Sequence, residues 1–134
     1  MDKSERHEYT AGLRVFSERL KLAELEARLG RATDGRDIGD PVSRRRADSP
    51  RRQHALWSIE SSVERTRPLD EHIDEVLTFA EKHRDTLDAL RPDCRIDIFC
   101  GVFSGVEAQG GFTFEPSLSR RLNDLQLPVV VDLY

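Results

Sequence analysis

The chain has 134 residues and a formal net charge of −4, with 34% charged and 37% hydrophobic residues. This length is typical of one domain, and such a domain can bury a core without a disulfide or a metal ion. The acidic balance disfavours a protein built chiefly to hold nucleic acid, because such proteins are usually basic. We therefore expect a single domain over residues 1–134.

Positive charge is concentrated in residues 30–53, a stretch that has no leucine or aromatic residue. It contains Arg31, Arg36, Arg44, Arg45, Arg46, Arg51 and Arg52. A stretch of this length without a packing face predicts a long arginine-rich loop, either flexible or functional.

No apolar run is long enough to cross a membrane, and the polar N-terminus does not resemble a secretory signal. Cys94 and Cys100 would stand about 20 Å apart in an extended strand, too far for a disulfide. Two free thiols fit a reducing compartment, so we expect a cytoplasmic protein without membrane contact.

The first half of the chain predicts two strands and a helix. Apolar residues alternate over residues 9–16 and again over 54–60, which is typical of strands. Leucines at helical spacing predict a helix over residues 18–29, and Gly30 supplies a stop signal.

The second half begins with the clearest periodicity, an apolar stripe that predicts one long helix over residues 68–90. Residues 94–103 alternate as a strand, and a short helix is expected from Pro116. Residues 129–134, which are apolar except for Asp132, predict a last strand, which we expect inside the sheet.

These elements predict an α+β fold made of two strand-helix-strand halves, at 9–60 and 94–134, joined by the long helix. Each half is expected to be a right-handed crossover. Together they would form a four- to five-stranded sheet with helices on one face, for which ferredoxin-like is the nearest named architecture.

Several segments recur in an order and spacing that point to a family. They are Leu13-Arg14-Val15-Phe16, Leu29-Gly30, Gly39-Asp40-Pro41, Leu56-Trp57-Ser58-Ile59-Glu60-Ser61, Ile96-Asp97-Ile98-Phe99-Cys100, Phe112-Thr113-Phe114-Glu115-Pro116-Ser117-Leu118 and Val131-Asp132-Leu133-Tyr134. Over roughly residues 12–134 the sequence resembles the uncharacterised bacterial family called domain of unknown function 4279. The resemblance implies the fold and a bacterial source, and it implies no activity.

Residue types that carry catalysis or bind metals do not form a recognisable constellation. His72 and His83 would lie about 16 Å apart along one helix, too far to share a metal ion, and each should keep one ring nitrogen in contact with water. The cysteines lack partner spacing, and no nucleophile or phosphate-loop motif occurs. We therefore predict no catalytic residue, metal or cofactor, and we do not favour an enzyme.

The alternation of the strands sends a mixed set of side chains to the helix-free face of the sheet. The set comprises Arg14, Phe16, Leu56, Ser58, Glu60, Arg95, Asp97, Phe99, Val130, Asp132 and Tyr134. Aromatic residues combined with both signs of charge are typical of protein interfaces.

The leading hypothesis is a non-catalytic module, immunity- or antitoxin-like, that binds a protein partner or itself through this face, with Arg14, Asp97, Phe99, Asp132 and Tyr134 as binding residues. The alternative is a binder of a small ligand or of nucleic acid that uses Arg44, Arg45 and Arg46 and the adjacent cleft. An undetected enzyme, with a pocket lined by Arg14, Asp97 and Asp132, is a third hypothesis.

Overall fold

The computed structural model describes residues 7–43, 45–104 and 111–134. In chain order their elements are β1 (Glu8–Ser17), α1 (Leu22–Leu29), β2 (Asp34–Arg36), β3 (Ala55–Glu60), α2 (Leu69–Lys82), α3 (Arg84–Leu90), β4 (Cys94–Phe103), α4 (Pro116–Asp124) and β5 (Val129–Leu133). The predicted α+β class is confirmed. Within these described ranges, no helix is long and apolar enough to cross a membrane.

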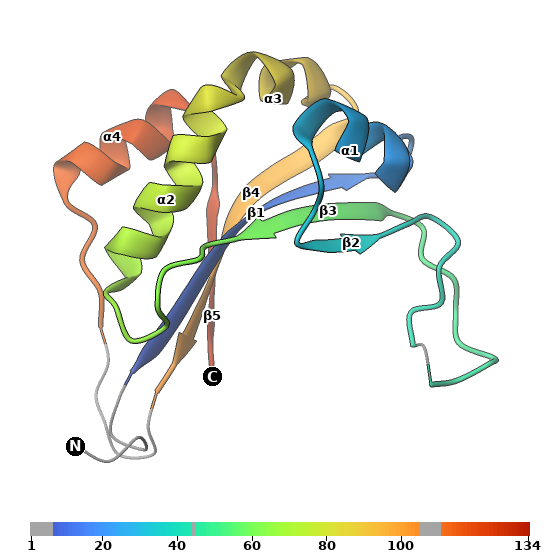
Figure 1. Cartoon of the computed structure of the whole chain (residues 1–134), viewed down its shortest axis with the longest axis horizontal. Helices are drawn as coiled ribbons and strands as arrows, with labels where there is room; N and C mark the ends of the chain where they lie inside the picture. Colours follow the sequence, from blue (N-terminus) through green and yellow to red (C-terminus); the bar gives the residue numbers. More distant parts are fainter. Residues whose placement is uncertain (1–6, 44, 105–110) are drawn as a thin grey trace.

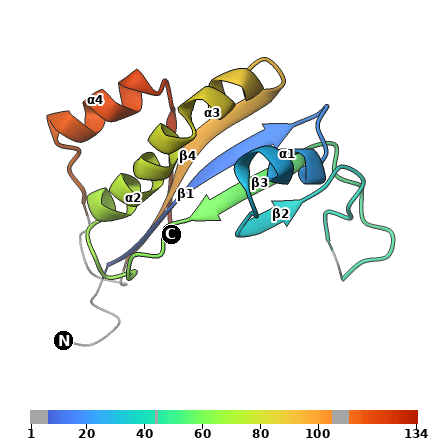
Figure 2. The same cartoon turned by 45° about the horizontal axis from the view of Figure 1, so that its top comes forward.

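The five strands form one mixed sheet in the order β2-β3-β1-β4-β5. Neighbouring strands are antiparallel except β4 and β5, which run parallel. Figures 1 and 2 show the helices on one side of the sheet, as predicted, and no helix of the described residues on the other side.

The topology corrects two expectations. β1 and β3 are antiparallel neighbours, so residues 9–60 do not form a crossover between adjacent parallel strands, whereas β4-α4-β5 joins two parallel neighbours. β5 lies at an edge of the sheet, not inside it. The ferredoxin-like architecture is not confirmed. The sheet has a fifth strand, which lies beside β4 and runs parallel to it.

The core lies between the sheet and the helices. Leu13, Val15, Trp57 and Ile98 are fully buried there against leucines of the helices. The indole Nε1 of Trp57 donates to the carbonyl of Gly30 at 2.8 Å, which satisfies the one polar group of this large side chain. The contact ties the C-terminal end of α1 to the middle of β3.

Two predicted boundaries differ from the structure. The helix expected over residues 68–90 is divided at His83, whose ring stacks on Phe79 at 4.1 Å and whose Nδ1 lies 3.0 Å from the Phe79 carbonyl. α1 begins at Leu22 instead of residue 18, because the Ser17 hydroxyl accepts the amide hydrogens of Arg19 and Leu20 and holds a turn.

Residues 30–53 were expected to lack a packing face, and this is wrong for their first part. Residues 34–36 form β2, which pairs with β3 at the edge of the sheet. Ala32 and Ile38 pack against the core on either side of β2. β2 has no hydrophobic residue, so hydrophobic alternation gave no sign of it.

His72 is fully buried, which corrects the expectation that one of its nitrogens stays in water. Its Nδ1 lies 2.9 Å from the Ser61 hydroxyl, and its Nε2 is buried without a partner among the described residues. Burial lowers the pKa of His72 below its usual value, because it disfavours the charged imidazolium. The nearby backbone of Arg67 and Glu64 raises the pKa, but by less.

This burial predicts that His72 makes stability fall on acidification. The unfolded chain takes up the proton near pH 6.5, before the folded chain does, so the free energy of unfolding should decrease as pH drops from about 6.5 towards the folded-state pKa. The slope is at most about 1.4 kcal/mol per pH unit. Urea titrations of wild type and His72→Gln between pH 5 and 7.5 measure it, and parallel curves would contradict the prediction.

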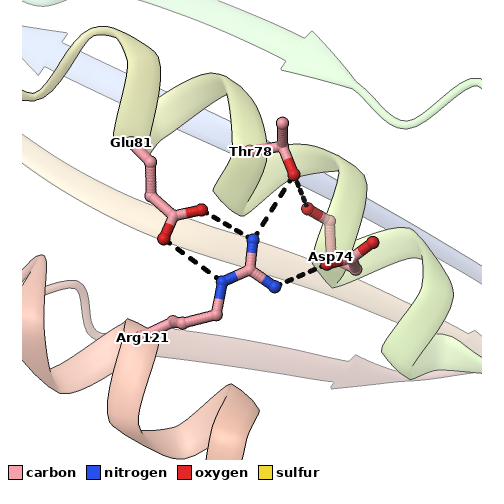
Figure 3. A network of polar contacts seen from close by, with 4 residues as sticks. All are labelled: Asp74, Thr78, Glu81 and Arg121. Atoms are coloured by element: carbon pink, nitrogen blue, oxygen red, sulfur yellow. Dashed lines mark hydrogen bonds and ion pairs between the residues drawn. The ribbon is translucent and has the colours of Figure 1, made fainter.

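Arg121 of α4 forms ion pairs with two carboxylates of α2. Figure 3 shows the guanidinium of Arg121 between Asp74 and Glu81, with Thr78 beside it. Hydrogen bonds with Glu81 and Asp74 raise the pKa of Arg121 above its usual value. Three acceptors held by one planar cation form a network, which stabilises more than an isolated surface pair.

Arg121→Met keeps most of the side-chain volume and removes these hydrogen bonds. We expect the free energy of unfolding to fall by about 1 kcal/mol, and by less as salt screens the pairs. Arg120→Met is the matched control, because Arg120 is exposed and forms no ion pair with a described residue. Equal losses in the two variants would show that the network is unimportant.

Candidate functional site

The centre of the helix-free face is an ion pair between the two central strands. Arg14 of β1 lies directly opposite Asp97 of β4 and binds it with two hydrogen bonds, of 2.8 and 2.9 Å. The Arg14 guanidinium lies over the rings of Phe16 and Phe99, at 5.0 and 4.4 Å from their centres. Asp97 is only 3% exposed, so the pair is largely removed from water.

The structure thus brings three of the predicted binding residues together: Arg14, Asp97 and Phe99. It places them as a packed cluster whose two charges already satisfy each other. The other two predicted residues on this face lie at the β5 end. Asp132 is opposite Gly101, and Tyr134 stacks on Phe103 at 4.6 Å.

A cleft of about 800 Å³ lies beside this cluster, between residues 51–54, the end of β1, the start of β3 and the start of β4. Phe16, Leu56 and Arg95 line it and belong to the helix-free face, so the cleft adjoins that face. Five arginines line the cleft against two carboxylates, although the whole chain has a net charge of −4. The arginines are Arg19, Arg51, Arg52, Arg91 and Arg95.

Two of the five arginines already have partners. Arg19 pairs with Asp93 at 3.2 Å, and Arg91 binds Asp88 and the backbone carbonyls that follow α4. The guanidinium groups of the other three, Arg51, Arg52 and Arg95, donate no hydrogen bond to any residue that the structure describes, and no ion pair there includes them. The Nε of Arg52 is also buried, and a buried donor without an acceptor is costly.

The backbone that carries Arg51 and Arg52 is fixed. The amide of Gly39 donates to the carbonyl of Arg52 at 2.8 Å, and the amide of Arg52 donates to the carbonyl of Asp40 at 2.7 Å. The carboxylate of Asp37 accepts the amide hydrogen of Leu22 at 3.0 Å, which ties this segment to the first turn of α1. Gly39 supplies the turn with a φ of +91°, a conformation that favours glycine.

Two of the three arginines predicted from their run in the sequence do not line the cleft. Arg45 and Arg46 are exposed at the far end of the loop and do not line the cleft, and Arg44 lies outside the described residues. The run of three arginines was the stronger sequence signal. Arg51 and Arg52 could have been preferred because they lie only a few residues before a predicted strand, which anchors their backbone.

The described residues that line the cleft do not form a nucleophilic or metal-binding group. Cys94 lines it, but burial raises the pKa of this thiol, and burial raises the pKa of Cys100 to about 12. No three His, Cys, Asp or Glu side chains in the described part of the chain are grouped to hold a metal ion. The chemistry that the cleft offers is recognition of negative charge by arginine.

Arg14→Met leaves the buried Asp97 carboxylate without a counter-ion. We expect it to lower the free energy of unfolding in urea by about 3–5 kcal/mol, and Arg14→Met/Asp97→Leu to recover at least half of that loss. Arg95→Met is the control, since Arg95 is exposed on the same face and should lose less than about 1 kcal/mol. A loss below about 1 kcal/mol for Arg14→Met would mean that the pair is dispensable.

Comparison with known proteins identifies the family. Residues 7–134 match the family described as "Domain of unknown function (DUF4279)", which confirms the resemblance found in the sequence. No curated protein and no solved structure matches the chain. Because the match spans nearly the whole chain, the protein belongs to the DUF4279 family, whose description leaves its function open.

Proposed function

We propose that this protein is a cytoplasmic binding protein, not an enzyme, and that its ligand is an anion held in the arginine-lined cleft. The observation that carries the proposal is that Arg51, Arg52 and Arg95 line one cleft and have no acceptor among the described residues. Elsewhere in the described chain, Arg67 and Arg121 are engaged by carboxylates, whereas Arg45, Arg46 and Arg120 form no ion pair with a described residue but do not line this cleft. Three cations without such partners in one concave site favour a negatively charged ligand.

An anion in the cleft is better supported than a protein partner at the centre of the helix-free face. Arg14 and Asp97 satisfy each other there, and the guanidinium of Arg14 is covered by Phe16 and Phe99. Charges already paired inside the protein have little to offer a partner. Loss of Arg14 would also lower the free energy of unfolding, so a variant at this position would not separate binding from folding.

A protein partner is the second candidate, and one observation favours it. At the β5 end, Val130, Leu133 and Tyr134 are 37%, 75% and 65% exposed. Large apolar side chains in water at a sheet edge are typical of contact surfaces. Such a partner would contact β5 and would be insensitive to substitutions in the cleft.

The proposed site is tested with a pair of variants of equal charge. Pyrophosphate is the probe, and its affinity is measured by titration calorimetry at low salt. Arg51→Gln/Arg52→Gln should weaken binding more than tenfold, because each lost charge-assisted hydrogen bond is worth about 1.5–3 kcal/mol. Arg45→Gln/Arg46→Gln removes the same charge outside the cleft and should change the affinity less than twofold.

Two results would overturn the proposal. Equal losses in the two double variants would mean that pyrophosphate responds only to net charge and not to the cleft. No binding of pyrophosphate by the folded wild type at millimolar concentration would show that the arginines do not form an anion site.

A further inference from the structure

The cleft has an apolar wall as well as arginines. Phe16 and Leu56 line it from the sheet, and Val42, which is 54% exposed, lines it from the loop. A small inorganic anion would leave this wall in contact with water. The wall therefore indicates a ligand that carries an apolar or planar part beside its charge.

Arg95 offers a flat surface within the same cleft. It lies opposite Phe16 in the pairing of β1 with β4, and its guanidinium lies 4.4 Å from the centre of the Phe16 ring. The guanidinium carbon thus lies over the Phe16 ring, while the residue as a whole is exposed. A planar guanidinium beside an aromatic ring is a group on which a second aromatic ring can stack.

Arg51 and Arg52 supply the charged end. Planar guanidinium groups match the oxygens of a phosphate through paired hydrogen bonds, and a phosphate can accept from more than one arginine. The backbone hydrogen bonds of residues 39–42 with 50–52 hold these two residues in place before any ligand arrives.

We propose that the ligand of the cleft is a phosphate ester that carries a planar aromatic ring, the chemical class of a mononucleotide. The inference rests on the proposed anion site and adds the ring. In this arrangement Arg51 and Arg52 bind the phosphate, and the ring stacks on Arg95 above Phe16. The volume of about 800 Å³ lies within the range of small-molecule sites. A nucleic acid strand is disfavoured, because an extended strand needs a basic stripe and this chain has a net charge of −4.

The test compares three probes on the purified protein by titration calorimetry: AMP, ribose 5-phosphate and adenosine. AMP should bind at least about tenfold more tightly than either of the others, because only AMP has both parts. Arg95→Lys keeps the charge and removes the flat surface. It should weaken AMP about tenfold and change the affinity for ribose 5-phosphate less than twofold.

The failures of this inference and of the proposed anion site are distinguishable. If ribose 5-phosphate binds as tightly as AMP, or if Arg95→Lys weakens both equally, the ring makes no contact and the inference is wrong while the anion site stands. If neither these phosphates nor pyrophosphate binds, both proposals are wrong. A single-stranded oligoribonucleotide that binds more than tenfold tighter than AMP would replace the small-molecule site with a polymer site.

Discussion

The ion pair between Arg14 and Asp97 lies at the centre of the pairing of β1 with β4. A slip of one residue between these strands would turn Asp97 towards the buried face and expose apolar residues such as Ile98. A carboxylate only 3% exposed is tolerated where it is because Arg14 meets it with two hydrogen bonds. The pair therefore favours one register at the centre of the sheet, and the other strands are added on either side.

The same register builds the cleft wall. Two residues along β1 from Arg14, Phe16 lies opposite Arg95, so the strand pairing that aligns the ion pair also aligns the stacked pair. In the loop that also lines the cleft, hydrogen bonds between residues 39–42 and 50–52 position the backbone of Arg51 and Arg52, and Asp37 ties this segment to α1. Backbone that is held in place before a ligand binds lowers the entropic cost of binding.

Sequence patterns predicted the elements with strong hydrophobic periodicity and missed those that contacts determine. β4 was predicted with its observed bounds, because its apolar residues alternate over its whole length. β2 consists of three residues, none with an apolar side chain, and at the division between α2 and α3 the His83 ring contacts Phe79, which periodicity does not encode. Of the candidate site, alternation identified the face that holds Arg14, Asp97 and Phe99. It could not reveal that they satisfy one another, or that Arg51 and Arg52 line the cleft while Arg45 and Arg46 do not.

The grouping of three arginines without a described partner in one cleft is the strongest physical argument for a ligand. The chain has more carboxylates than lysines and arginines, and exposed arginines such as Arg65 and Arg67 pair with a carboxylate, whereas Arg120 forms no ion pair with a described residue and stands outside the cleft. Within the cleft, Glu18 is engaged by His54 and Asp93 by Arg19, which leaves Arg51, Arg52 and Arg95 without an acceptor in the described structure. Like charges gathered in one concave site raise the local positive potential, which favours a negatively charged ligand. An anion bound in the cleft would accept charge-assisted hydrogen bonds from these guanidinium groups, and these bonds are the physical basis of the proposed affinity.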